Sequence, residues 1–268
     1  MAIDSKLRSL RTIVRQNSKT FIDHIIETKV SRNGSKLKSS KQTEYCIFCN
    51  SKINITKEHV IPRWTFEKSA ERYFITDVNG MHQTYNRTTV PACAKCNNDW
   101  LSHLENYIID LFKNGNWQNS FFSNYEIQNI IRWLEIIEYK FQILEVRKKF
   151  VASKHGGFIP FLADFPLSVM RKSKDYSPNK VVSEIRLARK RVTIKSKNEN
   201  VNSLVVFKTK NESFYFFHNM NEFIYLELPQ HKIALFYFYT KIFETPLAAY
   251  KEAMEVISNV YNQNKNSP

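Results

Sequence analysis

The chain of 268 residues has little of several features that would place it in a special class. No stretch approaches the roughly 18 consecutive apolar residues of a membrane-spanning helix, so no membrane partner is expected. Residues 1–6 lack the apolar core of a signal peptide. Glycine occurs only 5 times while 43% of the residues are apolar, a composition typical of a globular protein with a buried core.

Acidic residues are scarce relative to basic ones, and the net charge is +15. Residues 1–43 hold 10 Lys/Arg against 3 Asp/Glu, and residues 171–197 hold 10 against 2. Basic segments attract phosphates and gain affinity by releasing counterions, which favours nucleic acid as a partner. The alternative is that both segments are solvated faces that only aid solubility. The second segment supplies the candidate nucleic-acid-binding residues Arg186, Arg189, Lys190 and Arg191.

Cysteine is confined to four positions, which form two close pairs. The pairs are Cys46-Ile47-Phe48-Cys49 and Cys93-Ala94-Lys95-Cys96. Two C-x2-C pairs have the spacing of a tetrahedral four-thiolate zinc site, in which each pair supplies two ligands. Two independent redox pairs are the alternative. Thiolates that are kept for zinc suit a reducing compartment, so a cytoplasmic protein is expected.

Between the cysteine pairs lies an acid followed by histidine and, three residues later, proline. The string is Glu58-His59-Val60-Ile61-Pro62-Arg63. Within a zinc-stabilised frame, His59 is a candidate general base beside a second, catalytic metal, and a neighbouring carbonyl or side chain would fix its tautomer. Arg63 is a candidate phosphate contact. In a non-catalytic zinc ribbon, His59 would only be a packed or capping residue.

Hydrophobic periodicity predicts helices on both sides of this module. Residues 4–28 are expected to form an amphipathic helix, followed by a basic connector to residue 43. Residues 125–149 are expected to form a long buried helix. A final helix is expected from Pro246, with Thr245 as its N-cap. Its predicted apolar line consists of Leu247, Tyr250, Met254, Ile257 and Tyr261.

Strands are expected mainly in the C-terminal half. Residues 204–239 have runs of Val, Phe and Tyr separated by turns, which is typical of an antiparallel meander. Parts of 181–195 alternate as in a strand with one basic face. The predicted fold class is α+β, with three parts. These are a basic N-terminal helix and linker (1–43), the cysteine module (44–124), and an accessory domain of helices and antiparallel sheet (125–268) that senses, binds a partner or binds nucleic acid.

Residues 44–105 resemble the zinc-stabilised branch of the HNH (ββα-metal) nuclease family. The resemblance lies in the two cysteine pairs, in the string from Glu58 to Pro62, and in Asn97 directly after the second pair. It implies a metal-dependent endonuclease that hydrolyses phosphodiester bonds of DNA, often in bacterial restriction or anti-phage systems. Many members have asparagine where Thr88 stands, and Asn86 lies two residues earlier.

The resemblance also implies roles for individual residues. His59 corresponds to the general base, and Glu58 and Asn97 correspond to ligands of a catalytic Mg²⁺ or Mn²⁺. Cys46, Cys49, Cys93 and Cys96 correspond to the ligands of a structural Zn²⁺. Two alternatives stay open, a non-catalytic zinc module that binds nucleic acid and a nuclease held inactive until a partner binds. A protein partner or a homodimer is also left open.

Overall fold

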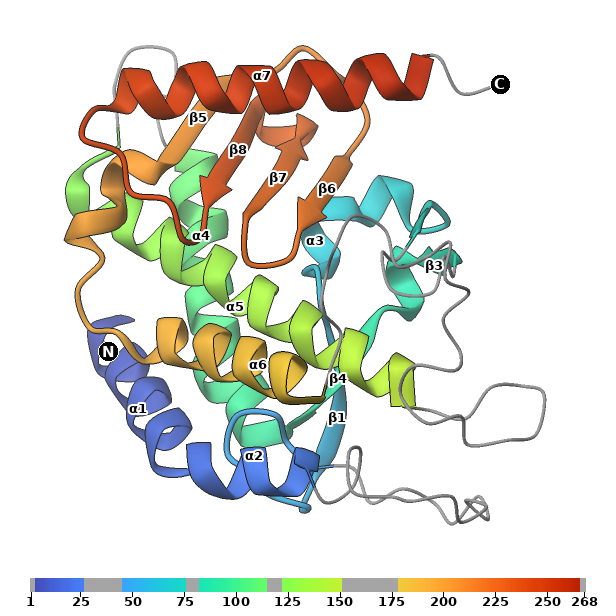
Figure 1. Ribbon diagram of the computed structural model, residues 1–268, viewed down its shortest axis with the longest axis vertical. Helices are drawn as coiled ribbons and strands as arrows, with labels where there is room; N and C mark the ends of the chain where they lie inside the picture. Colours follow the sequence, from blue (N-terminus) through green and yellow to red (C-terminus); the bar gives the residue numbers. More distant parts are fainter. Residues whose placement is uncertain (1–2, 27–44, 76–81, 115–121, 151–177, 266–268) are drawn as a thin grey trace. The chain divides into compact units, whose positions relative to one another are not determined.

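The computed structural model describes residues 3–26, 45–75, 82–114, 122–150 and 178–265 (Figure 1). The chain divides into two compact units, Met1–Tyr107 with Ile136–Lys195 and Ile108–Glu135 with Ser196–Pro268. Helices and antiparallel sheets are both present, so the α+β class is confirmed. None of the helices in the described ranges is long and apolar enough to cross a lipid bilayer.

Two helices, α1 (Ile3–Gln16) and α2 (Ser18–Ile25), open the first unit in place of the single helix predicted over 4–28. The helices meet at Asn17, whose side-chain amide donates to the carbonyl of Ile13 at 2.9 Å. Such local side-chain hydrogen bonds compete with a continuous helix. The predicted apolar face is confirmed, since its members are buried: Leu7, Leu10, Val14, Phe21 and Ile25. The predicted connector up to residue 43 lies outside the described residues.

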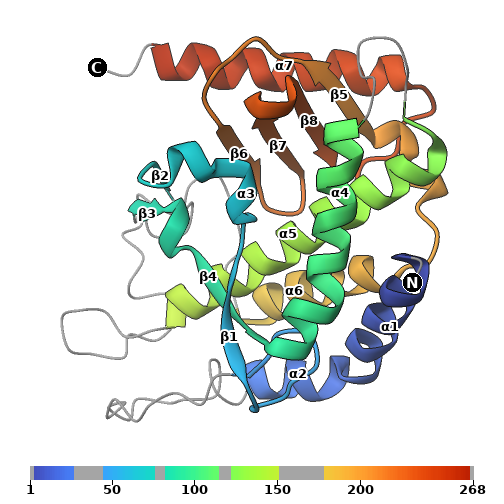
Figure 2. The same cartoon turned by 180° about the vertical axis from the view of Figure 1, so that it is seen from behind.

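The cysteine module contains a pair of antiparallel strands followed by a helix (Figure 2). Strand β1 (Ile55–His59) pairs with β4 (Thr89–Cys93), so that Glu58 lies opposite Val90 and His59 lies opposite Thr89. β4 leads into a π-helical segment, η4 (Lys95–Leu101), which continues as α4 (Ser102–Asn114). The chain between the two strands forms short elements: α3 (Arg63–Phe66), η2 (Glu67–Ser69), the antiparallel pair β2 (Tyr73–Ile75) and β3 (His82–Thr84), and η3 (Tyr85–Arg87).

Helix α5 (Asn124–Phe150) confirms the long helix predicted over 125–149. Its start is capped by Ser123, whose hydroxyl donates to the Glu126 carboxylate at 2.8 Å and lies 3.4 Å from the Glu126 backbone N–H. Nearly every side chain from 129 to 144 is buried. That stretch also holds buried polar side chains, namely Asn129, Glu135, Glu138, Lys140 and Gln142.

The strand predicted within 181–195 is wrong, because this segment forms helix α6 (Pro178–Thr193). The buried residues follow a helical spacing: Val182, Ile185, Ala188 and Val192. Leu187, which made the local pattern look alternating, is 48% exposed. Pro178 occupies the first helical position, where a missing N–H costs nothing.

The second unit is built on a four-stranded antiparallel sheet with the strand order β5-β8-β7-β6. The strands are β5 (Leu204–Lys208), β6 (Tyr215–Asn219), β7 (Phe223–Leu228) and β8 (Ile233–Phe238), with the short helices η7 (Asn198–Ser203) and η8 (Pro229–His231) before β5 and β8. The predicted meander is confirmed for β6, β7 and β8. β5 lies at the outer edge beside β8, so it does not follow the meander order.

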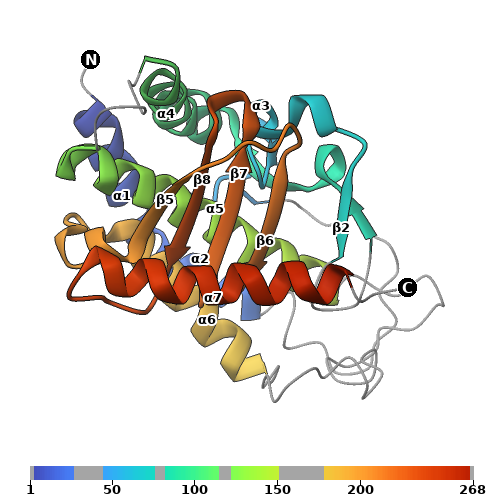
Figure 3. The same ribbon diagram turned by 90° about the horizontal axis from the view of Figure 1, so that it is seen from above.

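Helix α7 (Pro246–Lys265) crosses one face of this sheet (Figure 3). Its predicted start is confirmed, since the Thr245 hydroxyl accepts from the backbone N–H of Ala248 at 3.3 Å. The predicted apolar line is wrong in its first half. Ala249 and Ala253 face the sheet and are fully buried, whereas Leu247, Tyr250 and Met254 are exposed. Small side chains let the helix approach the aromatic residues of the strands closely.

The two units differ from the division predicted at residues 43 and 124. Helices α1 and α2 belong to the same unit as the cysteine module, and so does α6. Helices α4 and α5 each contribute to both units, with unit boundaries after Tyr107 and Glu135. The cysteine module is therefore part of a larger unit, and the sheet with α7 forms the core of the other.

Substitution in α7 tests its packing. Ala253→Leu places extra methylenes against the sheet and should lower the free energy of unfolding by about 1–3 kcal/mol. Met254→Ala, a change at the exposed neighbouring residue, should stay within about 0.5 kcal/mol of the parent protein. Urea unfolding of both variants measures the difference. Equal losses in the two variants would contradict the assigned packing face.

Candidate metal centre and adjoining histidine site

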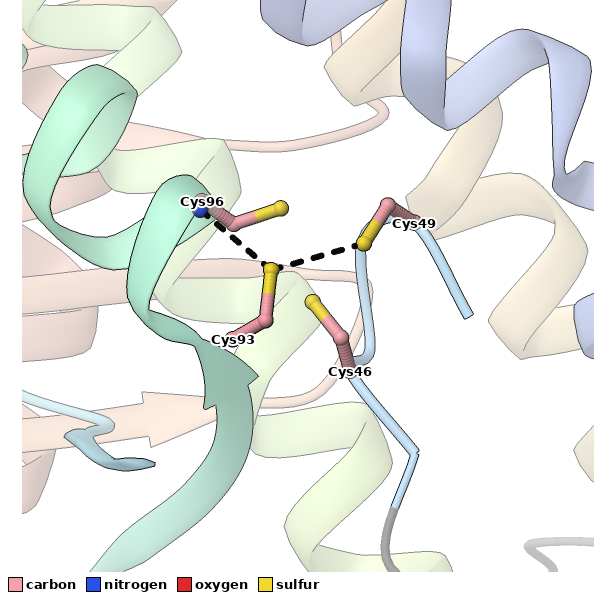
Figure 4. Close-up of side chains that lie close together, drawn as sticks. All are labelled: Cys46, Cys49, Cys93 and Cys96. Carbon is pink, nitrogen blue, oxygen red and sulfur yellow. Dashed lines mark hydrogen bonds between the residues drawn. The ribbon is translucent and has the colours of Figure 1, made fainter. Parts of the chain in front are cut away.

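Four cysteine side chains from two segments meet in the first unit, with their sulfurs directed toward one another (Figure 4). Cys46 and Cys49 lie in a turn before β1, Cys93 ends β4, and Cys96 lies in η4. The four Sγ atoms lie within 4.8 Å of one another. With Zn–S bonds of about 2.3 Å, the sulfurs of a zinc tetrahedron stand about 3.8 Å apart. The predicted cysteine cluster is confirmed, and its donor set fits zinc.

Backbone hydrogen bonds hold the first cysteine turn in shape. The N–H of Asn50 donates to the carbonyl of Cys46 at 2.9 Å, and the N–H of Cys46 donates to the carbonyl of Ser51 at 2.8 Å. Asn50 has φ of 60°, a left-handed conformation that asparagine tolerates better than most residues. The turn therefore reverses the chain tightly enough for Cys46 and Cys49 to face the same centre.

The thiols of the cluster do not ionise independently. A hydrogen bond from Cys49 lowers the pKa of Cys46, because the thiol proton stabilises the neighbouring thiolate. The hydrogen bond to Cys46 is also the main cause that raises the pKa of Cys96. Protons shared among the sulfurs thus favour a mixed thiol–thiolate state. Zinc binding would displace these protons, which is the usual coupling of zinc binding to proton release.

Arg189 is not a nucleic-acid contact, contrary to the sequence-based prediction. Its guanidinium is buried and donates to the carbonyls of Ile47 at 2.6 Å, Phe48 at 2.9 Å and Val14 at 3.1 Å. It also lies over the ring of Phe21, at 4.6 Å from the centroid. Ile47 and Phe48 are the residues between the first two cysteines, so Arg189 supports the cysteine turn from within the core.

The other predicted phosphate-binding residues differ in exposure. Arg186 and Lys190 are exposed on α6, and Arg63 is exposed at the start of α3. Arg191 is half-buried, and its guanidinium lies 3.9 Å from the Glu138 carboxylate of α5. Arg186, Lys190 and Arg63 are therefore accessible to an anion, whereas the charge of Arg191 is partly neutralised by a carboxylate.

His59 ends β1 with its ring half-buried beside Phe66. Its Nε2 lies 3.2 Å from the backbone carbonyl oxygen of Asn86. Because a carbonyl oxygen only accepts, Nε2 is the protonated nitrogen and Nδ1 carries the lone pair. A neighbouring carbonyl or side chain was expected to select the tautomer, and the backbone carbonyl of Asn86 lies in that position.

Glu58 precedes His59 and faces the opposite side of the strand. Its buried carboxylate accepts from the Nζ of Lys140 at 2.6 Å, and the same ammonium donates to the His59 carbonyl at 2.8 Å. The Glu105 carboxylate of α4 lies 3.9 Å from this Nζ. Burial raises the pKa of Glu105 to about 7; the Lys140 charge opposes this shift and the Glu58 charge adds to it.

Asn97 lies in η4 and contacts β1. Its side-chain amide donates to the hydroxyl of Thr56 at 3.1 Å, and this hydroxyl donates to the carbonyl of Ala92 in β4 at 2.8 Å. Thr56 and Glu58 are two residues apart on the strand and so share a face. Within the described ranges, the four cysteines form the only close group of three or more Cys, His, Asp or Glu ligands.

Sequence reasoning missed three residues of this region. Lys140 and Glu105 complete the charge cluster at Glu58, and neither belongs to a local motif. Thr88 was noted only as a departure from the family pattern. It is buried, its hydroxyl donates to the Thr84 carbonyl at 2.7 Å, and its own carbonyl accepts from the Val60 N–H at 2.9 Å. Thr88 thus supports the loop that carries Asn86.

Comparison with known proteins gives no relative for this chain, because no protein-family model, no curated protein and no solved structure matches it. The interpretation of the site therefore depends on its own residues and geometry.

Removing one thiolate tests the metal centre. Cys96→Ser should lose zinc and unfold the first unit, because a buried zinc site contributes its binding free energy to folding. Lys95→Ser changes the exposed neighbouring residue and should keep one zinc per chain. Metal analysis and circular dichroism on both variants make the measurement. A folded Cys96→Ser protein with full zinc content would disprove the four-thiolate site.

The raised pKa of Glu105 gives a pH-dependent stability. The folded state holds this proton more tightly than the unfolded state, whose value is near 4.5, so stability is lost as pH rises from about 4.5 to about 7. The full shift corresponds to about 3 kcal/mol. Glu105→Gln cannot ionise and should gain about this much stability relative to the parent between pH 5 and pH 8. Urea unfolding at pH 5 and pH 8 measures how much the free energy of unfolding changes with pH in each protein. If the parent and Glu105→Gln change by the same amount, the raised pKa of Glu105 is refuted.

Proposed function

We propose that the chain is an HNH-type endonuclease that hydrolyses phosphodiester bonds of nucleic acid, with DNA as the expected substrate. The observation that carries the proposal is the placement of His59. It ends the first strand of a two-strand-plus-helix unit held by four cysteines, and its ring is fixed by the Asn86 carbonyl. The restriction or anti-phage setting implied by the resemblance stays a prediction.

His59 acts in this proposal as the general base. Its Nδ1 accepts a proton from the water that attacks phosphorus, while Nε2–H remains bonded to the Asn86 carbonyl. As the water oxygen bonds to phosphorus, the bond from phosphorus to the leaving sugar oxygen breaks, and that oxygen takes up a proton from solvent. The imidazolium that results donates from both nitrogens, so the same carbonyl stabilises the product of proton transfer. The backbone contact thus orients the ring before and after the step.

The resemblance to the HNH family implies a catalytic Mg²⁺ or Mn²⁺, and such an ion would stabilise the charge that develops on the phosphate. The donor set predicted for it, Glu58 with Asn97, does not fit a ready cation site. The Glu58 carboxylate is buried against the Lys140 ammonium, and the Asn97 amide is bonded to Thr56. Glu58 therefore does not act as a metal ligand in the proposed hydrolysis.

The basic residues of α1 and α6 are proposed to hold the nucleic-acid backbone. Both helices belong to the first unit, and the Arg15 guanidinium of α1 donates to the Thr193 carbonyl at the end of α6. Arg8 and Arg15 are exposed on α1, Lys19 is exposed on α2, and Arg186 and Lys190 are exposed on α6. Burial lowers the pKa of Arg11, and the charges of Arg8 and Arg15 add to this effect. Clustered cations of this kind favour an anionic partner.

Plasmid cleavage tests the catalytic assignment. His59→Ala should lower the rate of nicking by about 10²–10⁴-fold, because it removes the base and leaves the zinc ligands intact. His103→Ala removes an exposed histidine of α4 and is the matched control. The assay is run with Mg²⁺, Mn²⁺ or EDTA on the purified protein.

The outcomes separate the two candidate functions. Cleavage that depends on divalent ions and is lost only in His59→Ala supports the endonuclease. Equal cleavage by His59→Ala and His103→Ala would remove His59 from the site. A zinc-loaded protein that retards plasmid without cutting it points to a non-catalytic binding module, a reading that the Glu58–Lys140 ion pair favours.

Charge removal on α6 tests the binding surface. Substituting both Arg186 and Lys190 by Gln should weaken DNA binding and reduce the slope of log K against log salt by about 2. Substituting the exposed Lys210 and Lys251 by Gln removes the same charge elsewhere and should leave the slope nearly unchanged. Fluorescence anisotropy across a salt series measures both slopes. Equal slopes for the two double variants would show that α6 is only a solvated face.

A further inference from the structure

The ammonium of Lys140 is enclosed by oxygen atoms from two parts of the first unit. It lies 2.6 Å from Glu58 Oε1, 2.8 Å from the His59 carbonyl oxygen and 3.9 Å from Glu105 Oε1. The Lys140 side chain is 1% exposed. Oxygen donors around a buried positive charge are also what a hard divalent cation selects.

We propose that Lys140 is the resident cation of the Glu58 site and takes the place expected for a divalent metal. Glu58 is then a positioning residue, since its carboxylate holds the ammonium that in turn binds the His59 backbone. Lys140 is also a positioning residue, since its ammonium binds the His59 backbone carbonyl directly. That Lys140 occupies the cation position at Glu58 does not depend on the proposed endonuclease function. That it positions His59 as a general base does rest on that function.

Burial explains why a metal would not simply displace the lysine. A metal at Glu58 would neutralise the carboxylate, but the displaced Lys140 ammonium would stay inside the core without its counter-charge and its hydrogen bonds. An unpaired buried charge of this kind is strongly unfavourable. Lys140 also lies within the buried stretch of α5. The ion pair is therefore the stable occupant.

The cluster fixes His59 from both ends. Lys140 donates to the backbone carbonyl of His59, and the backbone carbonyl of Asn86 accepts from its ring. The end of β1 is thereby held by a charged contact where the strand runs into the loop. Within the proposed function, Lys140 sets the position of the general base without touching the substrate.

The experiment measures Mn²⁺ binding by electron paramagnetic resonance on the zinc-loaded full chain, without nucleic acid. It compares the parent protein with Glu58→Gln, Lys140→Ala and the double variant. At pH 8 the Glu105 carboxyl of the parent is mostly ionised, since its pKa is about 7. In Lys140→Ala the loss of the Lys140 charge raises this pKa, so Mn²⁺ competes with a proton for the carboxylate. The parent and Glu58→Gln should bind Mn²⁺ equally. Lys140→Ala should bind about tenfold more tightly or better, because two carboxylates lose their resident cation, and the double variant should lose this gain.

Two results would overturn the proposal. One is weaker Mn²⁺ binding by Glu58→Gln than by the parent, which would make Glu58 a metal ligand despite the lysine. The other is a folded Lys140→Ala protein with no gain in Mn²⁺ binding. If Lys140→Ala does not fold, the parent and Glu58→Gln decide the question alone. Because no cleavage is measured, failure here is distinct from failure of the endonuclease proposal.

Discussion

The first unit depends on one buried cation, the guanidinium of Arg189. This side chain binds backbone carbonyls of the first cysteine turn and of α1, while the rings of Phe21 and Tyr139 lie against it. A buried charge of this kind is costly unless every hydrogen bond is made, so its partners are held in fixed places. The turn that carries Cys46 and Cys49 therefore relies on helices far away in the sequence. The metal centre is not a self-contained insertion.

Short-range patterns could be predicted from the sequence, and features set by tertiary contacts could not. The cysteine spacing, α5 and the strands β6 to β8 follow from periodicity within a few residues. α6 was misassigned because Ile185 and Leu187 alternate locally, although the longer period that includes Val192 is helical. In α7 the larger apolar residues were expected to be buried, but close packing against an aromatic sheet selects Ala249 and Ala253 instead.

The same limit applies to the candidate site. His59 and the cysteines were found through a local string, whereas Lys140 lies 81 residues beyond His59 and belongs to no motif. A clue was present, because charged residues interrupt the apolar pattern of this long helix and have to be paired if they are buried. Reading α5 only as core overlooked them. The identity of the cation at Glu58 is thus a property of the folded unit and not of the motif.

The sharing of α4 and α5 between the two units has a consequence for how the chain acquires its fold during synthesis. Each unit is discontinuous, since 108–135 interrupts the first and 136–195 interrupts the second. The first cannot be completed until α6 has left the ribosome, although all four cysteines emerge much earlier. The four thiols of the nascent chain are therefore exposed before Arg189, which supports the cysteine turn, has been synthesised. No cut at a single peptide bond separates the chain into two complete units, because at least one of the two always loses a segment.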